Sequence, residues 1–527
     1  MLEADGQLLS NPAPTLLRLR QLGVDDVRFS MHWQAIAPDA NSFKAPQGFN
    51  PSNPADYSAT TWAPYDALIR LAAADEVSID LDVLGGAPLW ATGPAMPKTS
   101  NCPCHNWQPS PVQYGDFVHA LGVRYSGDYD PVTGKLAPGN PADLPAVHFW
   151  SIWNEPNYGP SLAPQGTPGN ATVEASPRIY RDLVDQAWTA LANTGHRNDT
   201  ILIGELAPRG TLTFGNFNGM TPLQFVKALY CVNGAYQRLH GMAAAERGCP
   251  TTASASAHFA VANPGLFHAS GFSDHPYMRW YPPNREEDVP VTPHFSQLLP
   301  NYASLAEIGN LETGLDRALG AYGSSRKFPI WNTEFGYITS PPKKPTKKDP
   351  YPWVSPQTAA YYDNWAEYLS WKDPRIMSFD QYLLEDPLPA LASNDEGGFA
   401  SGLLAYGGQQ KPGYSAFRLP VFLPSTTASS SDQALEVWGA AKPVHFAFLD
   451  SPAAPQVVEL LFKATGSPSY LPLDSIAVTS PQGYFDIHVA FPSSGTLVLS
   501  WTYPQDLALG TPDGYTVYSR SVQVTVK

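Results

Sequence analysis

Two glutamates in this chain each follow a short apolar segment that ends in Ile, Trp and Asn. Glu155 completes IWNE within HFWSIWNEPNYG, and Glu334 completes IWNTE within FPIWNTEFG. Two carboxyl groups that face one cleft can break a glycosidic bond, because one protonates the leaving oxygen while the other attacks the anomeric carbon. Asn154, directly before Glu155, offers a side-chain donor for a sugar hydroxyl beside that bond. The spacing therefore predicts a pair of catalytic carboxylates, Glu155 and Glu334.

Each glutamate taken alone has a simpler interpretation. A glutamate at a strand end commonly caps a helix or forms an ion pair, and a lone Asn-Glu-Pro occurs by accident in many chains. The two together are more informative, because each follows an apolar strand-like segment and three strand and helix repeats separate them. We therefore favour a catalytic pair over two structural carboxylates.

Apolar, β-branched segments alternate with helical patterns through most of the chain. The expected strands are 25–33, 77–86, 146–155, 200–208, 272–278, 328–336 and 375–384. The expected helices are 11–23, 63–75, 111–126, 176–195, 221–239, 305–323 and 356–372. This alternation predicts an α/β fold in which helical crossovers join the strands of a parallel sheet.

We predict that the sheet closes into a (β/α)8 TIM barrel. Seven strands are visible, so the first strand must lie in or before residues 1–5 and be very short or partly lost upstream. On that count Glu155 ends strand four and Glu334 ends strand seven. Reactive groups of such barrels stand at the carboxyl ends of the strands, where side chains enter the mouth.

The pattern of polar and apolar residues changes towards the C-terminus. We assign residues 1–424 to the catalytic barrel and the Ser/Thr-rich residues 425–432 to a linker. Residues 433–527 alternate polar and apolar positions over short runs, including 444–450, and predict an all-β sandwich. This accessory domain either packs against the barrel or binds sugar.

WNEPN followed far downstream by WNTEFG resembles the retaining glycoside hydrolases of clan A, the superfamily with catalytic residues on strands four and seven. The chain is most similar to family 39, with family 5 next, over residues 5 to 420. The resemblance implies that Glu155 is the acid/base and Glu334 the nucleophile. It also implies that Asn154 contacts the 2-hydroxyl of the sugar at the cleavage point.

The same resemblance implies three supporting residues. Arg28, in VRFSMHW, matches the arginine that supports the nucleophile. His275 and Tyr277, in DHPY, match a pair on strand six whose tyrosine hydrogen-bonds the nucleophile. The chain departs from the family at Phe335, where family 39 commonly has Trp, and at Tyr382, which replaces a Trp platform on strand eight.

Aromatic rings that stack on sugar faces should lie after the strands. The candidates for sugar contact are Trp33, Trp90, Trp280, Trp331 and Tyr382, and each tryptophan has the alternative of a core position. Glu205, at the end of strand five, is a further candidate for direct sugar recognition. Asp82 lies within strand three, and its structural interpretation is a buried, hydrogen-bonded carboxylate inside the barrel.

Composition excludes several other functions. The chain has 47 acidic and 32 basic residues among 527, a net charge of −15, which disfavours nucleic acid as a partner. No apolar run reaches the roughly 18 residues of a membrane span. Signatures of serine hydrolases, zinc peptidases and nucleotide-binding enzymes are missing, so we expect no cofactor and no metal.

We therefore predict a retaining glycosidase whose partner is a carbohydrate, with plant-type polysaccharides or glycosides as substrates. A transglycosylase that uses the same glutamates and a non-catalytic carbohydrate-binding barrel are the alternatives.

We expect Cys231 and Cys249 to form a disulfide, whereas Cys102 and Cys104 are bridged, free or part of a zinc site. A disulfide favours secretion, with a leader absent from this chain. Four lysines in 343–348 form either a solvated loop or a contact with a decorated glycan.

Overall fold

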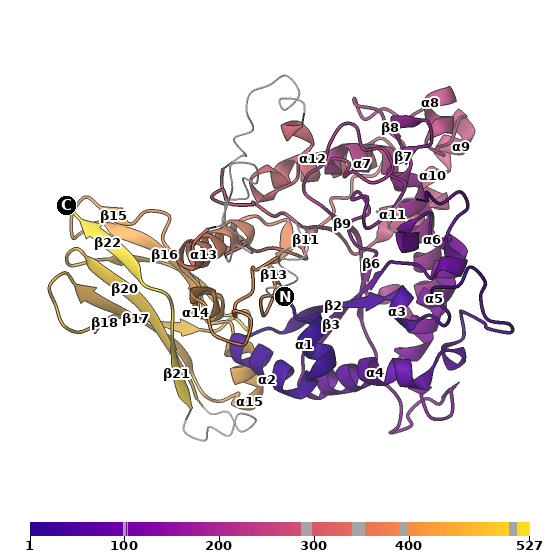
Figure 1. Ribbon diagram of the computed structural model, residues 1–527. Helices are drawn as coiled ribbons and strands as arrows, with labels where there is room; N and C mark the ends of the chain where they lie inside the picture. The colour runs from indigo at the N-terminus through magenta and orange to yellow at the C-terminus, as the bar shows by residue number, and fades with distance from the viewer. Residues whose placement is uncertain (99–101, 103, 286–297, 340–353, 389–398, 505–513) are drawn as a thin grey trace.

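The described residues between Met1 and Arg418 form a closed barrel of parallel strands surrounded by helices (Figure 1). Val421 and Phe422 pair with a strand of the C-terminal sandwich, so the boundary between the domains lies a few residues before the expected position 424. The computed structural model describes residues 1–98, 102, 104–285, 298–339, 354–388, 399–504 and 514–527. The lysines of 343–348 lie outside the described residues. In barrel order the strands are β1 (Leu2–Glu3), β2 (Asp26–His32), β3 (Ser78–Leu84), β6 (Phe149–Ile152), β9 (Thr200–Leu206), β10 (Gly271–Asp274), β11 (Ile330–Asn332), and β12 (Ile376–Ser378) with β13 (Gln381–Tyr382).

The first strand of the barrel contains only two residues. Leu2 and Glu3 pair on one side with Val27 and Arg28 of β2, and on the other side with β13. The eighth strand is split, because β12 pairs with β11 whereas β13 pairs with β1. The prediction of a (β/α)8 barrel with a very short first strand is confirmed.

Helices cover the outside of the barrel. The longer ones are α2 (Pro12–Leu22), α4 (Ala59–Ala74), α5 (Pro111–Arg124), α6 (Ser176–Asn193), α7 (Pro222–Leu229), α12 (Ile308–Gly320), α13 (Pro356–Lys372) and α14 (Pro412–Arg418). Shorter helices are α1 (Asp5–Ser10), α3 (Trp33–Ile36), α8 (Gly241–Glu246), α9 (Ala253–Ala257), α10 (Phe259–Ala262) and α11 (Pro264–His268). Two small hairpins, β4–β5 (Tyr129–Asp130 and Lys135–Leu136) and β7–β8 (Gly166–Thr167 and Asn170–Glu174), lie in the loops.

The predicted helix 221–239 is wrong in its second half. Helix α7 ends at Leu229, and the chain then turns around Asn233. The Asn233 side chain accepts hydrogen bonds from the backbone N–H groups of Ala235 and Gln237, both at 2.9 Å. Such a local turn competes with continuation of the helix. The predicted disulfide Cys231–Cys249 follows directly and is present in the structure.

The C-terminal part is a sandwich of two sheets. One sheet contains β14 (Val421–Phe422), β16 (Ala434–Ala440) and β19 (Tyr484–Ala490). The other contains β15 (Thr427–Ala428), β22 (Val522–Val526), β20 (Gly495–Tyr503), β17 (Gln456–Ala464), β18 (Leu471–Val478) and β21 (Tyr515–Tyr518). Strand β15 lies inside the expected linker, so part of that segment belongs to a sheet.

Residues 444–450, expected as a strand, form helix α15 (Val444–Asp450) instead. Val444 and Ala447 face the core of the sandwich, whereas Phe446 enters the core of the barrel. A strand places alternate residues on opposite faces, whereas a helical turn brings Val444 and Ala447 to one side. The helix therefore fills the space between the two domains.

The sandwich packs against helix α13 of the barrel (Figure 1). Lys442 and Tyr484 of the sandwich both contact the carboxylate of Glu367, at 2.9 and 2.7 Å. Arg520 donates to Asn364 at 2.8 Å. These buried polar contacts fix the relative position of the two domains.

Candidate active site

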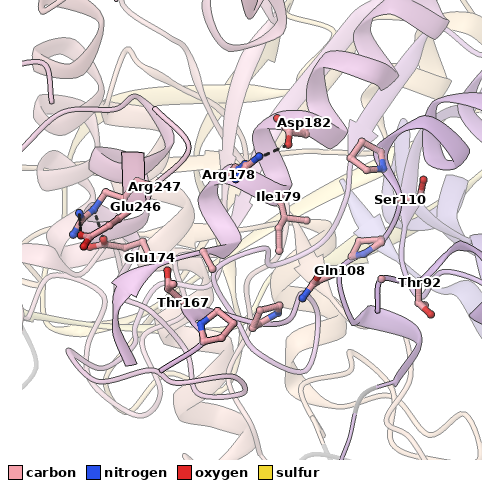
Figure 2. A pocket seen from close by; sticks show the side chains of 16 residues that line it. Thr92, Gln108, Ser110, Thr167, Glu174, Arg178, Ile179, Asp182, Glu246 and Arg247 are labelled. Carbon is pink, nitrogen blue, oxygen red and sulfur yellow. Dashed lines mark hydrogen bonds and ion pairs between the residues drawn. The ribbon is translucent and has the colours of Figure 1, made fainter. Parts of the chain in front are cut away.

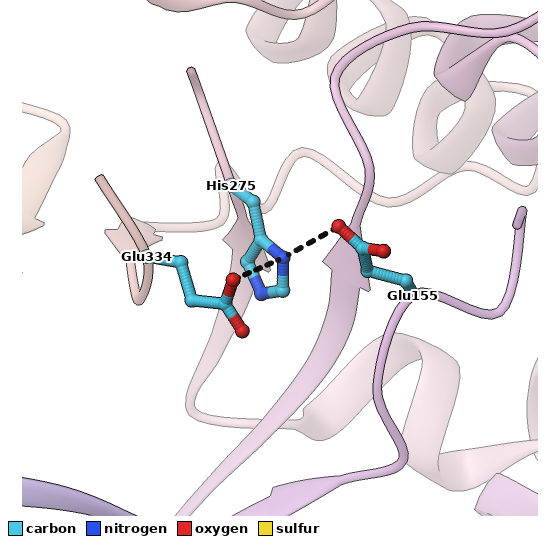
Figure 3. A group of neighbouring side chains, drawn as sticks. All are labelled: Glu155, His275 and Glu334. Carbon is cyan, nitrogen blue, oxygen red and sulfur yellow. Dashed lines mark hydrogen bonds and ion pairs between the residues drawn. The ribbon is translucent and has the colours of Figure 1, made fainter. Parts of the chain in front are cut away.

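Glu155 and Glu334 face each other across the mouth of the barrel (Figure 3). One oxygen of Glu155, one oxygen of Glu334 and the Nδ1 atom of His275 all lie within 4.8 Å of one another. The Glu155 side chain is 19% exposed and that of Glu334 is 11% exposed, so both remain reachable from the cleft. The structure therefore brings together the two carboxylates that the sequence singles out.

The local backbone turns Glu155 out of its strand and into the mouth. After β6 ends at Ile152, Trp153 and Glu155 adopt φ angles of 66° and 41°, in the left-handed region. Pro156 follows and has no N–H to continue the strand ladder. The Glu155 N–H instead donates to the carbonyl of Glu205 at 2.8 Å.

Arg28 is the centre of a buried network beneath the two glutamates. Its Nη1 atom donates to Glu334 at 2.9 Å and to Glu3 at 2.6 Å. Its Nη2 atom donates to Asp82 at 2.8 Å, to Asn154 at 2.9 Å and to Glu205 at 3.2 Å. Arg28 is almost fully buried, so it holds Glu334 and Asn154 and does not contact substrate itself. The bond to Arg28 uses the carbonyl oxygen of Asn154 and not its amide N–H groups.

Tyr277 and His275 complete the surroundings of the nucleophile candidate. The Tyr277 hydroxyl donates to the second oxygen of Glu334 at 2.9 Å. His275 contacts Glu155 through Nδ1 at 3.1 Å and Glu205 through Nε2 at 2.9 Å. Burial alone would lower the pKa of His275, but the carboxylates of Glu334, Glu155 and Glu205 outweigh burial and raise the pKa well above its usual value.

Glu205 does not reach the sugar position, contrary to the expectation of direct recognition. Its side chain is fully buried, and its Oε2 accepts hydrogen bonds from Arg28, His275 and Thr333. Burial opposes its charge, but Arg28 and His275 outweigh burial and lower the pKa of Glu205 to about 2. Glu205 is therefore an ionised support beneath Glu155 and Glu334.

Two of the predicted aromatic contacts are wrong. Trp33 is fully buried on α3, where it stacks on Phe117 with 5.8 Å between ring centroids. Trp331 lies in the middle of β11, three residues before Glu334, and contacts Phe149 at the start of β6. Side chains that early in their strands lie inside the barrel and below its mouth.

The remaining aromatic candidates are partly exposed. Tyr382 lies beside Tyr277, with 6.2 Å between ring centroids. Trp280 follows β10 and stacks on Tyr281. Trp90 lines a cavity of about 750 Å³ together with Phe43. These three stay predictions as sugar contacts.

Sequence reasoning missed Glu3 and Thr333. Glu3 lies on a two-residue strand that has no recognisable pattern of its own. Thr333 stands inside the quoted IWNTE segment, and its position one residue before Glu334 was the available signal. Asp82 is the buried barrel carboxylate that the alternative interpretation described.

Comparison with known proteins finds likeness in solved structures only. No family model matches the chain, and no curated protein matches it. A β-glucuronidase from Bacteroides uniformis is 11% identical, with a TM-score of 0.38, over 98% of this chain and 43% of that one. A family 39 glycoside hydrolase from Bacteroides cellulosilyticus WH2 is 13% identical, with a TM-score of 0.41, over 91% and 76% of the chains. A family 1 β-glucosidase from Thermotoga maritima is 13% identical, with a TM-score of 0.42, over 77% and 83%.

The chain thus spans less than half the length of the β-glucuronidase that it matches. The expected resemblance was to family 39, and a family 39 enzyme is among the matching structures. At such identities the chemistry has to be inferred from the site itself.

A second cavity lies away from these residues (Figure 2). It has a volume of about 460 Å³ and is bordered by Gln108 and Ser110 on one side and by Glu174, Arg178 and Arg247 on the other.

Cys102 and Cys104 are free thiols in this structure. Among the described residues, no helix has the length and apolar character needed to cross a membrane.

Proposed function

We propose that this protein is a retaining glycoside hydrolase. The observation that carries the proposal is the meeting of Glu155 and Glu334, whose oxygens lie within 4.8 Å. Inverting enzymes separate their carboxyl groups by about 6.5 to 9.5 Å to admit a water, whereas retaining enzymes bring them to about 5 to 5.5 Å. The observed approach favours direct attack on the sugar by one of the two groups.

The contacts of each glutamate support a division of roles. Glu334 accepts hydrogen bonds from Arg28 and Tyr277, at 2.9 Å each, and such donors stabilise an ionised nucleophile. The Glu155 carboxylate forms a side-chain hydrogen bond with His275 and is the more exposed of the two carboxyl groups, which suits an acid/base that meets the leaving group and then water. Asn154 would bind the sugar hydroxyl next to the reacting carbon.

In the proposed reaction Glu334 attacks the anomeric carbon while Glu155 gives its proton to the leaving oxygen. Glu155 then removes a proton from water while the water oxygen attacks the anomeric carbon, the bond from that carbon to Glu334 breaks, and the sugar leaves with its original anomeric configuration. We further propose plant-type polysaccharides or glycosides as substrates. Secretion is also proposed, and the Cys231–Cys249 disulfide supports it because such bonds persist in oxidising compartments.

The test combines a substrate screen with stereochemistry. A panel of aryl glycosides and polysaccharides identifies a substrate, and ¹H NMR of the first product determines its anomeric configuration. Glu334→Ala should lose activity, and azide should restore turnover by forming a glycosyl azide of opposite configuration. Glu174→Ala, which removes a buried glutamate outside the barrel mouth, is the matched control and should stay active.

Two results would contradict the proposal. Inversion of configuration would exclude a covalent intermediate on Glu334. Full activity of both Glu155→Ala and Glu334→Ala would exclude the pair from catalysis and would favour a non-catalytic barrel. Formation of alkyl glycosides on addition of an alcohol would show that transglycosylation competes with hydrolysis at the same intermediate.

A further inference from the structure

We propose that the cavity of about 750 Å³ beside Trp90 binds the apolar leaving group of a glycoside, its aglycone, and not a further sugar of a polysaccharide. The ligand class is an aromatic or similarly apolar alcohol. The assignment rests on the proposed function, because it names the group that departs when the glycosidic bond breaks. Of the two substrate classes proposed above, it selects glycosides.

The cavity lies on the same face of the barrel as the two glutamates. Phe43 belongs to the connection from β2 to α4, and the other lining residues, between Leu89 and Cys104, belong to the connection from β3 to α5. Both connections leave the carboxyl ends of parallel strands, and these ends form one face of a barrel. Glu155 and Glu334 follow their strands on that face.

The cavity wall continues into a contact with the segment that follows Glu155. Cys104 lines the cavity, and two residues later Asn106 donates to the carbonyl of Pro160 at 2.6 Å and accepts from the Ala163 N–H at 2.8 Å. Residues 156–163 come directly after Glu155, the proposed acid/base. Because the acid/base gives its proton to the leaving oxygen, the leaving group departs on the side of this segment.

The lining offers apolar contacts and few hydrogen bonds. Seven of the eleven lining residues have apolar side chains, among them Phe43, Leu89, Trp90 and Met96. Among the described residues that line the cavity, none has a carboxylate or a side-chain amide. Sugar sites place such groups against the hydroxyls of the ring, and this cavity does not.

The polar groups beside the aromatic wall are already used within the protein. The indole N–H of Trp90 donates to the carbonyl of Pro38 at 3.0 Å, and the Thr92 hydroxyl donates to the carbonyl of Leu89 at 2.7 Å. The ammonium group of Lys98 belongs to an exposed residue. A sugar would therefore bury hydroxyls without partners, which costs affinity, whereas an apolar ring has no hydroxyls to satisfy.

Phe43 and Trp90 form an aromatic wall that exists before any ligand binds. Phe43 is 70% exposed, the highest value among the Phe, Tyr and Trp residues that the structure describes. The Trp90 ring meets Phe49 and Trp33 edge-on, with 5.8 and 6.2 Å between ring centroids, so its orientation is fixed. An aromatic aglycone would remove the Phe43 ring from water, and this burial favours binding.

The binding test uses 2-naphthol as the probe and needs no turnover. Calorimetric titration of the full chain should show one 2-naphthol per chain with a negative heat-capacity change, which is the mark of apolar burial. Phe43→Ala and Trp90→Leu should each weaken binding by about tenfold or more. Tyr518→Ala is the matched control, because it removes an aromatic residue that is 52% exposed on β21 of the sandwich and should leave the titration unchanged.

Matched substrates test the substrate class. Phenyl and 2-naphthyl glycosides of one sugar have leaving groups of similar acidity, so a difference between them reports contacts of the second ring. We expect kcat/KM of the wild type to be about tenfold higher for the naphthyl glycoside. This advantage should disappear in Phe43→Ala and remain in Tyr518→Ala.

The outcomes separate the aglycone site from the proposed function. Absence of 2-naphthol binding, or equal binding by wild type and Phe43→Ala, would overturn the aglycone site. A trisaccharide cleaved faster than a disaccharide, with the gain lost in Phe43→Ala, would assign the cavity to sugar and would also overturn it. If 2-naphthol binds as expected but no glycoside is cleaved, the apolar site stands and the glycosidase proposal fails. If glycosides are cleaved without any advantage of the naphthyl group, the aglycone site is wrong while the glycosidase proposal stands.

Discussion

Replacement of Arg28 by lysine tests whether the buried guanidinium organises the active site. The four N–H groups on Nη1 and Nη2 of Arg28 serve five acceptors, one of the N–H groups being shared: Glu3, Glu334, Asp82, Asn154 and Glu205. A lysine ammonium keeps the positive charge but has only three donors, so at least two of the five acceptors lose their partner.

The expected magnitude follows from the number of lost bonds. Hydrogen bonds to charged groups contribute about 1.5 to 3 kcal/mol each, so two lost bonds reduce the free energy of unfolding by about 3 to 6 kcal/mol. Domains have about 5 to 15 kcal/mol of stability, so Arg28→Lys should still fold under mild conditions. If one lost bond is the one to Glu334, the barrier rises by about 1.5 to 3 kcal/mol and kcat falls roughly 10- to 150-fold.

Arg181→Lys is the matched control for this experiment. Arg181 is similarly buried, but it donates to the backbone carbonyl oxygens of Leu229 and Gly248, and no described carboxylate accepts a hydrogen bond from it. Urea unfolding should show a loss of stability in both variants, whereas glycosidase assays should show a fall in kcat only in Arg28→Lys. Equal kcat losses in the two variants, or an Arg28→Lys protein with unchanged kcat and stability, would refute the reasoning.

Three further predictions concern single groups. Tyr277→Phe removes the hydroxyl that donates to Glu334, so kcat should fall at least about tenfold while thermal unfolding shows a folded protein. Burial raises the pKa of Asp380 to about 7, against about 3.9 in an unfolded chain. Between these two values the unfolded chain releases a proton that the folded protein keeps, so the folded state of the wild type should lose up to about 4 kcal/mol of stability as pH rises from 4 to 7. Asp380→Asn should lack this loss in urea unfolding at each pH, and parallel pH curves for the two proteins would contradict it. Replacing both Cys231 and Cys249 by serine opens a loop with a sequence separation of 18. The free energy of unfolding should fall by about 3 kcal/mol, while KM stays the same. An unchanged unfolding midpoint would show that the disulfide does not stabilise the protein.

The meeting of Glu155 and Glu334 could be predicted from sequence because the positions of both residues follow from chain periodicity. An apolar strand that stops at a polar residue places that residue at the barrel mouth, and this applied to Glu155 and Glu334 alike. The same reasoning could not decide whether the Trp33 side chain is buried or exposed to the cleft, because a tryptophan after a strand turns towards either the core or the cleft. The prediction for Glu205 was wrong for a related reason. Its strand end was recognised, but the donors that hold it below the mouth come from β2 and from the residues directly after β10 and β11.

Glu3 shows why part of the site lay beyond sequence reasoning. A strand of two residues has no period, and its position is determined by the neighbours that pair with it. Leu2 and Glu3 join β13 to β2 and so close the barrel, and the register that closes it also places Glu3 beside Arg28. Closure of the barrel and the placement of the Arg28 guanidinium therefore depend on the same two residues. Because Arg28 in turn holds Glu334, the position of the proposed nucleophile is coupled to the packing of a two-residue strand of the barrel.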